Sequence, residues 1–264
     1  MVGWNIPNLL FRLPPSVKSM IEGPEVKDSG NILRVVDVVA GYGGEAVIKS
    51  ISIEVRRGEV VLIMGPNGSG KSTLAKAITG ELGLLGGQVF LRNVDISKWG
   101  EERRSGAGVG YVPQSRDVFP RLSVRDNLEM GAYRLNKKAG NDAIDRVLET
   151  FPQLGPLLRR PARQLSGGER KLVGIARALV ADPDLIILDE PTANLSPRVA
   201  ESVLTSVVDR LSELGHGVLL IEQRIAAALE RADTVHVLVD GRPRHSGPAA
   251  ALRGSSEIGD LFFR

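Results

Sequence analysis

The sequence predicts an α/β fold with a mostly parallel central sheet, a small antiparallel β layer and an inserted helical subdomain. From Ile32 onward, short β-rich runs alternate with helical stretches, which is the pattern of a largely parallel sheet covered by helices. Two short runs are apolar throughout, and the long stretch between Gln114 and Gln164 is polar, helix-prone and interrupted by prolines. Together these observations place the chain in the α/β class.

The predicted strands differ in how their apolar residues are spaced. Residues 51–55 (ISIEV) alternate apolar and polar side chains, as expected of a half-exposed strand near a sheet edge or in an antiparallel layer. Residues 60–64 (VVLIM) and 185–188 (LIIL) are continuously apolar, which suits central parallel strands buried on both faces. After the polar stretch, further strands are predicted at residues 218–221 and 234–239.

The polar stretch is predicted to be a mostly helical subdomain, inserted at about residues 115–164 into a single domain that spans residues 31–264. Prolines break it into short pieces, at Pro120, Pro152, Pro156 and Pro161. Residues 1–30 contain several prolines and lack the basic start and unbroken apolar run of a signal peptide. We expect them to form a poorly ordered N-terminal extension. A natural start at Met20, or contact of the apolar residues near Trp4 with a partner or membrane, are the alternatives.

Composition narrows the classes of function. The chain has 264 residues, of which 42% are hydrophobic and 25% charged, enough to bury a full core. A net charge of +3 is too weak a bias to indicate binding to nucleic acid, and the lack of cysteine excludes disulfides and thiolate metal sites. A membrane-spanning helix needs about 20 consecutive apolar residues, whereas the apolar runs at residues 60–64 and 185–188 have the length of strands. The sequence therefore predicts no membrane crossing.

A glycine-rich segment carries the first chemical signal. Residues 65–72 (GPNGSGKS) fit the pattern GxxxxGK[ST] between a predicted buried strand and a predicted helix. Such glycines let backbone N–H groups converge on a phosphate at a helix N-terminus. Lys71 is expected to reach the β- and γ-phosphates of ATP, and Ser72 to ligate Mg²⁺. A glycine-rich turn that only caps a helix is the alternative. The predicted nucleotide-binding residues are Gly65, Pro66, Asn67, Gly68, Ser69, Gly70, Lys71, Ser72 and Thr73.

Two carboxylates carry the second signal. The apolar run at residues 185–188 ends in Asp189 and Glu190, at the carboxyl edge where ligands of open α/β sheets bind. Asp189 would hold Mg²⁺, directly or through water, and Glu190 would orient or deprotonate the attacking water. Two acids before Pro191 also suit a simple turn after a strand. The phosphate loop upstream favours the catalytic interpretation.

The third signal is the segment LSGGE at residues 165–169, which precedes a predicted amphipathic helix. Ser166 and Glu169 have the spacing of a capping box, which explains these two residues but not Gly167 and Gly168 in the first turn. Lying between a phosphate loop and an Asp-Glu pair, this segment resembles the signature of ABC-type ATPases. The resemblance covers the chain from about Ile32 onward and implies a P-loop NTPase core of the ABC type. It also implies that Ser166, Gly167, Gly168 and Glu169 contact the γ-phosphate held by a second subunit.

The same resemblance assigns three further positions. Tyr42 resembles the aromatic residue that stacks on adenine, although a lone tyrosine in a glycine-rich turn is usually unremarkable. Gln114 resembles the glutamine that reaches Mg²⁺ and the attacking water. Residues 194–197 (NLSP) occupy the loop that crosses the dimer interface, but lack its usual aspartate. Gln223 stands where the family has a histidine, and an amide donates a neutral hydrogen bond without carrying a titratable proton. This departure implies slower turnover or reliance on a non-identical partner site.

Residues 117–133, 151–169 and 222–223 resemble one of the two paired ATPases of branched-chain amino-acid and urea importers. The resemblance implies a Mg²⁺-dependent ATPase that is cytoplasmic and peripheral on the inner face of the cell membrane. Its expected partners are a second ABC ATPase subunit, identical or related, integral membrane permease subunits and, indirectly, a solute-binding protein. Residues 119–127 would receive the coupling helix of the permease. A soluble ABC ATPase of the iron–sulfur assembly type and a weakly hydrolysing nucleotide-binding regulator are the alternatives.

Overall fold

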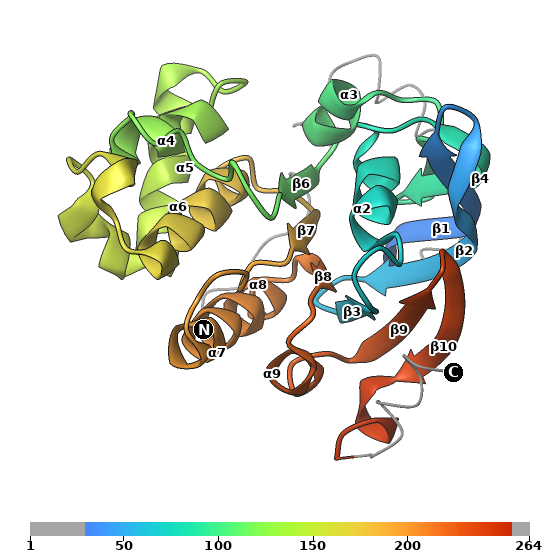
Figure 1. Ribbon diagram of the computed structural model, residues 1–264. Coiled ribbons are helices and arrows are strands. Elements are labelled where there is room, and N and C mark those ends of the chain that lie inside the picture. Colours follow the sequence, from blue (N-terminus) through green and yellow to red (C-terminus); the bar gives the residue numbers. More distant parts are fainter. Residues whose placement is uncertain (1–29, 255–264) are drawn as a thin grey trace.

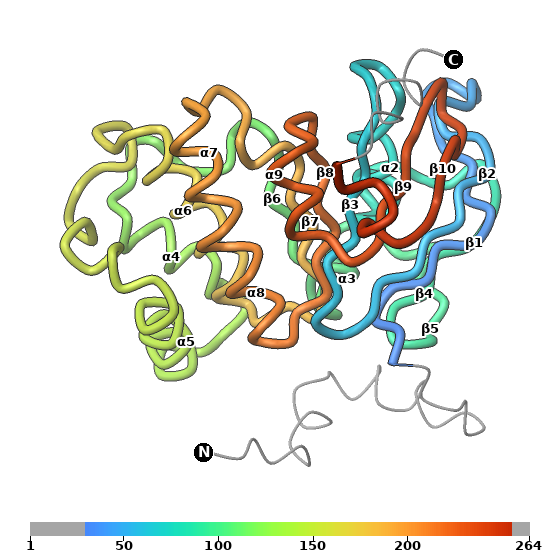
Figure 2. Tube along the Cα trace, turned by 90° about the horizontal axis from the view of Figure 1, so that it is seen from below, coloured from blue at the N-terminus to red at the C-terminus, as the bar shows by residue number. Residues whose placement is uncertain are grey.

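A computed structural model describes residues 30–254 of the chain and shows two sheets and a helical lobe (Figure 1). Seen from below, the helical lobe and the antiparallel sheet lie at opposite ends, with the parallel strands between them (Figure 2). Within residues 30–254, no helix is long and apolar enough to cross a membrane. The expected disorder of the N-terminal extension concerns residues that lie almost wholly outside this range.

The strands form one mostly parallel and one antiparallel sheet. The six-stranded sheet has the order β10-β9-β3-β8-β7-β6, in which only β10 pairs antiparallel, and the four-stranded antiparallel sheet has the order β2-β1-β4-β5. Both predicted layers are therefore confirmed. The strands are β1 (Asn31–Tyr42), β2 (Glu45–Arg56), β3 (Val60–Met64), β4 (Leu84–Leu91), β5 (Val94–Asp95), β6 (Val109–Val112), β7 (Leu185–Asp189), β8 (Gly217–Ile221), β9 (Thr234–Val239) and β10 (Arg242–Pro248).

The spacing of apolar residues explains which sheet each strand joins. Every residue of β3, β7 and β8 is buried, because the two faces of these strands pack into different hydrophobic cores. In β3, Val61 and Ile63 face the core shared with the antiparallel sheet and α2, whereas Leu62 and Met64 face the core shared with the other helices. In β2, residues 51–55 alternate buried and exposed, as predicted for a strand with one solvated face.

The helices surround the parallel sheet. They are α2 (Lys71–Thr79), α3 (Glu101–Gly106), α4 (Val124–Gly131), α5 (Lys137–Thr150), α6 (Gly167–Leu179), α7 (Pro197–Val203), α8 (Asp209–Glu213) and α9 (Ile225–Leu229). A π turn at Leu204–Val208 joins α7 to α8, and short 3₁₀ turns occur at Pro152–Leu157, Ala162–Gln164 and Ala249–Ala251.

The helical lobe contains α4, α5 and α6 and lies beside β6 and β7 (Figure 1). Its N-terminal helix, α4, is capped by Ser123, whose side chain and Asp126 form a capping box. The chain returns alongside this start, since Val124 N donates to Arg160 O at 3.0 Å and Ala162 N donates to Leu122 O at 2.9 Å. The stretch predicted to be a helical insertion therefore leaves the sheet after β6 and rejoins it through α6 and β7.

Candidate functional site

The phosphate loop links the end of β3 to the start of α2. Gly68 and Gly70 have φ values of 81° and 99°, in the left-handed region that favours glycine. A Cβ at Gly65 would lie 2.1 Å from Leu238 O, so only glycine fits at this position. Pro66 and Asn67 are exposed at the rim, whereas Ser69 Oγ is buried and has no hydrogen-bond partner among residues 30–254. The loop is thus a tight cradle that contains an unsatisfied polar atom.

Lys71 occupies the centre of this cradle. It is buried, and its Nζ donates to Gly65 O at 2.8 Å and to Pro66 O at 2.9 Å. Burial lowers the pKa of this ammonium group, and the carboxylates of Glu190 and Asp189 oppose that shift. Within residues 30–254, no side chain caps the first turn of α2, so its N-terminal N–H groups remain available beside the loop that the Lys71 ammonium group contacts. Such an arrangement favours an anion.

Asp189 lies at the carboxyl end of β7, beside the first turn of α2. Its Oδ1 accepts from Ser72 Oγ at 3.3 Å and its Oδ2 accepts from Tyr111 Oη at 3.2 Å. Burial raises the pKa of this carboxyl, while these two hydrogen bonds oppose the shift. Burial likewise raises the pKa of Tyr111, whose hydroxyl therefore remains a donor. The structure brings Ser72 and Asp189 together, as the sequence predicted.

Glu190 is held between two amide side chains. Its backbone is left-handed, with φ at 46°, and its side chain is buried. Gln114 Nε2 donates to one oxygen of the carboxylate, and Gln223 Nε2 donates to the other. Gln114 follows β6 and Gln223 follows β8, the two strands that flank β7 in the sheet. The three predicted catalytic side chains therefore meet at one point, at the carboxyl edge of the parallel sheet.

The signature segment lies apart from this cluster. Ser166 and Glu169 form the predicted capping box: Ser166 N donates to Glu169 Oε2 at 2.7 Å, and Glu169 N donates to Ser166 Oγ at 3.3 Å. These hydrogen bonds lower the pKa of Glu169. α6, which they start, runs in the helical lobe, on the other side of β7 from α2 (Figure 1). Among residues 30–254, no hydrogen bond joins Ser166 or Glu169 to the phosphate loop.

The remaining predicted positions occupy two different settings. Tyr42 ends β1 and is 52% exposed, so its ring is accessible to a ligand. Gly167 and Gly168 start α6. A Cβ at Gly167 would lie 2.9 Å from the Leu195 side chain, and a Cβ at Gly168 would lie 2.9 Å from the Val199 side chain. The first turn of α6 therefore packs closely on the loop after β7 and on the first turn of α7.

Sequence reasoning missed several residues around the site. Tyr111 binds Asp189, and Glu222 binds the loop after β7 through Thr192. Lys171 of α6 forms an ion pair with Asp117 at 2.8 Å and donates to Gln114 O at 3.1 Å. Tyr111 and Glu222 are direct neighbours of predicted motifs, and this proximity is the only signal that could have singled them out.

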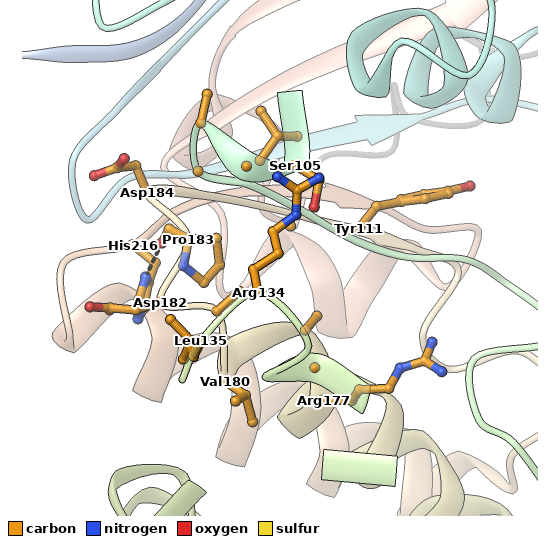
Figure 3. A pocket seen from close by; sticks show the side chains of 18 of the residues that line it. Ser105, Tyr111, Arg134, Leu135, Arg177, Val180, Asp182, Pro183, Asp184 and His216 are labelled. Carbon is orange, nitrogen blue, oxygen red and sulfur yellow. Dashed lines mark hydrogen bonds between the residues drawn. The ribbon is translucent and has the colours of Figure 1, made fainter. Parts of the chain in front are cut away.

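A groove of 1460 Å³ separates the helical lobe from the sheet (Figure 3). Ser105 of α3 and Tyr111 of β6 line one side, and Arg134 and Arg177 line the other. Arg134 reaches across to α3, where its Nη2 donates to Glu102 O at 2.8 Å and lies 3.2 Å from the Glu102 carboxylate. The groove also has an exposed apolar rim, formed by Phe119, Met130, Tyr133 and Leu135. Within the predicted coupling stretch 119–127, Phe119 lines this groove.

Comparison with known proteins decides the family. The ABC transporter family model matches residues 48–193, more than half of the chain. This chain belongs to the ABC transporter family. A probable branched-chain amino acid transport ATP-binding protein LivF of Archaeoglobus fulgidus is 38% identical over 84% of this chain and 94% of its own length. The high-affinity branched-chain amino acid transport ATP-binding protein BraG of Pseudomonas aeruginosa is 33% identical over 84% and 94%.

Solved structures of ABC transporter cassettes have the same fold. One in an ADP conformation gives a TM-score of 0.79 at 30% identity and covers 88% of this chain and 98% of its own. A dimeric bacterial ABC transporter cassette gives a TM-score of 0.72 at 25% identity and covers 82% and 98%. The predicted P-loop NTPase fold of the ABC type is confirmed. As a member of the family, the chain is an ATP-binding and ATP-hydrolysing transporter subunit, and the relatives give neither alternative function support.

Proposed function

We propose that this ABC subunit hydrolyses ATP with Glu190 as the group that accepts a proton from the attacking water, and that it powers import of branched-chain amino acids or related small solutes. The observation that supports the chemistry is the meeting of Gln114 and Gln223 on the Glu190 carboxylate, next to Asp189 and the phosphate loop. The names of the branched-chain amino acid transport relatives support the class of solute.

The nucleotide binds in the phosphate loop, at residues 65–73. The Lys71 ammonium group leaves Gly65 O and Pro66 O and donates instead to oxygens of the β- and γ-phosphates. These two hydrogen bonds are stronger because the phosphate oxygens are negatively charged. Ser69 Oγ, which is buried and lacks a hydrogen-bond partner in the described part of the chain, gains a phosphate acceptor. Tyr42, half exposed at the end of β1, stacks on the adenine.

The donor set beside the loop fits Mg²⁺. Asp189, Ser72 and Gln114 can each present an oxygen atom, and Mg²⁺ in nucleotide sites is held by one or two carboxylates together with substrate phosphates. When bound, Mg²⁺ neutralises charge on the β- and γ-phosphates. Asp189 is already oriented for this task, because Ser72 and Tyr111 each hold one of its oxygens.

Hydrolysis joins a water oxygen to the γ-phosphorus and breaks the bond from that phosphorus to the bridging oxygen, which leaves with ADP. The Glu190 carboxylate takes the proton from the water. Gln114 and Gln223 must give up at least part of their hold on this carboxylate, and their amide groups can then donate to the water or to the γ-phosphate. Because an amide side chain does not titrate, Gln223 can orient these groups but cannot shuttle a proton.

A second subunit completes the site. The residues Ser166, Gly167, Gly168 and Glu169 lie in the helical lobe and make no hydrogen bond to the phosphate loop within the described chain. A trans arrangement, in which one subunit's signature meets the nucleotide of the other, accounts for that separation. The similarity to a dimeric bacterial cassette supports this arrangement. The second subunit is an identical copy or a related ATPase.

The groove beside α3 receives the membrane permease subunits. Its exposed rim combines Phe119, Met130, Tyr133 and Leu135 with arginine side chains, a surface suited to an amphipathic segment. Through this contact the subunit is peripheral on the cytoplasmic face of the cell membrane, and a solute-binding protein acts indirectly through the permease. The proposed partners are consistent with the mild net charge, which does not indicate nucleic acid.

The test combines hydrolysis and solution mass. Mg²⁺-dependent phosphate release should vanish in Glu190→Gln, while ATP should shift that variant from monomer to dimer, because blocked hydrolysis traps the closed sandwich. Lys71→Ala is the matched control, which should neither bind ATP tightly nor dimerise. Phosphate release at the wild-type rate in Glu190→Gln would contradict the proposed chemistry. Tight ATP binding without a dimer would replace the homodimer with a non-identical partner or an obligatory membrane complex.

A further inference from the structure

Three consecutive residues after β8 each bind the loop that follows β7. Gln223 donates to the carboxylate of Glu190, as described above. On one side of it, Glu222 accepts hydrogen bonds from Thr192, and on the other, Arg224 Nη2 donates to Leu195 O at 2.5 Å. These contacts tie residues 222–224 to the loop at Glu190, Thr192 and Leu195. Residues 190–195 begin with the proposed catalytic base, Glu190, and lead toward the expected dimer interface.

Glu222 makes the most contacts of the three. Its side chain is 2% exposed, and both carboxylate oxygens are occupied. Oε1 accepts from Thr192 N at 2.9 Å and from Thr192 Oγ1 at 2.7 Å. Oε2 accepts from Gln223 N at 3.1 Å and, at 3.4 Å, from Arg224 N. Backbone N–H groups only donate, so both oxygens must act as acceptors.

The Glu222 carboxylate is buried without a positively charged partner among the described residues. Within residues 30–254, no lysine, arginine or histidine forms a salt bridge with it. Burial of a carboxylate without a cation is costly, and the hydrogen bonds around it offset that cost only while all the donors stay in place. The position of Thr192 and the conformation of the turn at residues 222–224 are therefore fixed together.

We propose that Glu222 is a positioning residue for ATP hydrolysis. It ties the loop after β7 to the turn that carries Gln223, so that the Gln223 amide stays aligned with Glu190, and movement of one loop moves the other. This inference rests on the proposed roles of Glu190 and Gln223. It adds that the position of the Gln223 amide depends on the buried carboxylate of Glu222, the residue before it.

The substitution Glu222→Gln tests the placement with a minimal change of shape. One amide oxygen can still accept from Thr192, but the amide NH₂ group then faces the N–H groups of Gln223 and Arg224, donor against donor. The turn must reorient, and the Gln223 amide moves with it. Because misplacement of a reacting group by about 1 Å can cost about 100-fold, kcat should fall by at least about tenfold. The KM for ATP should change less than about threefold, since among the described hydrogen bonds none joins Glu222 to the phosphate loop.

Glu59 provides a matched control. It also bridges two segments, since its carboxylate accepts from Arg56 N at 2.8 Å and from Thr234 Oγ1 at 2.8 Å. It precedes β3, at the opposite end of that strand from the phosphate loop. Glu59→Gln should therefore lower the melting temperature while kcat below that temperature stays at the wild-type level.

The experiment measures kcat, KM, equilibrium ATP affinity and thermal melting for Glu222→Gln, Glu59→Gln, Gln223→Ala and the double variant Glu222→Gln/Gln223→Ala. If Glu222 acts through Gln223, the double variant should have the kcat of Gln223→Ala, with ATP affinity retained. Multiplicative losses in the double variant, an unchanged kcat in Glu222→Gln, or an equal loss in Glu59→Gln would each overturn the inference. Glu222→Asp, which keeps the charge on a shorter side chain, replaces Glu222→Gln if that variant does not fold. Failure of the proposed chemistry would be seen separately, as wild-type hydrolysis that survives Glu190→Gln.

Discussion

Arg104 of α3 allows a quantitative test of how the phosphate-loop helix is supported. The side chain is 1% exposed, and burial lowers its pKa to about 10, so it remains charged at neutral pH. Its guanidinium group donates to four backbone carbonyls: Ala77 O and Ile78 O at 2.8 Å, and Trp99 O and Ser97 O at 2.9 Å. The first two belong to the last turn of α2, where carbonyls have no partner within the helix.

Arg104→Met keeps much of the aliphatic volume and removes every donor. Each buried carbonyl that loses its donor costs about 1 kcal/mol, which gives about 4 kcal/mol for the set. Removal of a buried charge returns part of its desolvation cost, so we expect a net loss of about 2 to 3 kcal/mol. For a domain of this size the melting temperature should fall by about 3 °C for each kcal/mol, or about 6 to 9 °C in all.

The measurement is thermal unfolding of the apo chain by circular dichroism. Arg103→Met is the control, because the Arg103 guanidinium stacks 3.8 Å from the centre of the Trp99 ring and such an exposed contact is worth only about 0.5 to 1 kcal/mol. A fall of less than about 2 °C in Arg104→Met, or an equal fall in both variants, would refute the view that the buried guanidinium supports α2.

Three further predictions concern single side chains. Burial lowers the pKa of His236 from 6.5 to about 4, so it is neutral when folded and takes up a proton on unfolding below pH 6.5. The free energy of unfolding should thus fall by about 3 kcal/mol from pH 6.5 to 4, and denaturant titrations of His236→Val should lack this component. Tyr111→Phe removes a donor to Asp189, so the Mg²⁺ concentration for half-maximal hydrolysis should rise about tenfold; an unchanged titration would deny the hydroxyl an orienting role. Ser166→Arg should bind ATP normally yet lose hydrolysis by at least about 100-fold, and wild-type turnover would refute the shared site.

The sequence was sufficient for the architecture because the relevant signals are local. Continuous apolar runs at β3 and β7 marked strands buried on both faces, and the alternation at residues 51–55 marked a strand with one solvated face. The phosphate loop and the Asp189–Glu190 pair were likewise short motifs beside predicted strands. Pairing of β6 with β7 and of β7 with β8 brings Gln114, Glu190 and Gln223 together. Only Glu190 was predicted from its place at a strand end, whereas the family resemblance assigned the two glutamines.

Long-range polar contacts could not be predicted in the same way. Arg104 lies in the run EERR, where nothing local distinguishes it from the exposed Arg103, and only the packing of α3 on the end of α2 buries its guanidinium group. Tyr111 and Asp189 are 78 positions apart, and Thr192 and Glu222 are 30 apart. Such pairs depend on strand order and on side-chain direction at the edge of the sheet, neither of which hydropathy specifies.

With the positioning role proposed for Glu222, the glutamine at position 223 does not by itself weaken this site. A histidine could reach the nucleotide as a cation and would change its charge near neutral pH, whereas an amide offers only a donor in a fixed direction. Direction is what the surrounding residues provide: Glu222 fixes the backbone of the turn, and Arg224 fastens its far end to Leu195 O. Once the Gln223 amide has moved from the Glu190 carboxylate to the γ-phosphate, a donor whose turn is held in place contributes to catalysis without changing charge. A neutral residue held by a buried carboxylate can therefore replace a titratable one, provided that both loops after β7 and β8 move together.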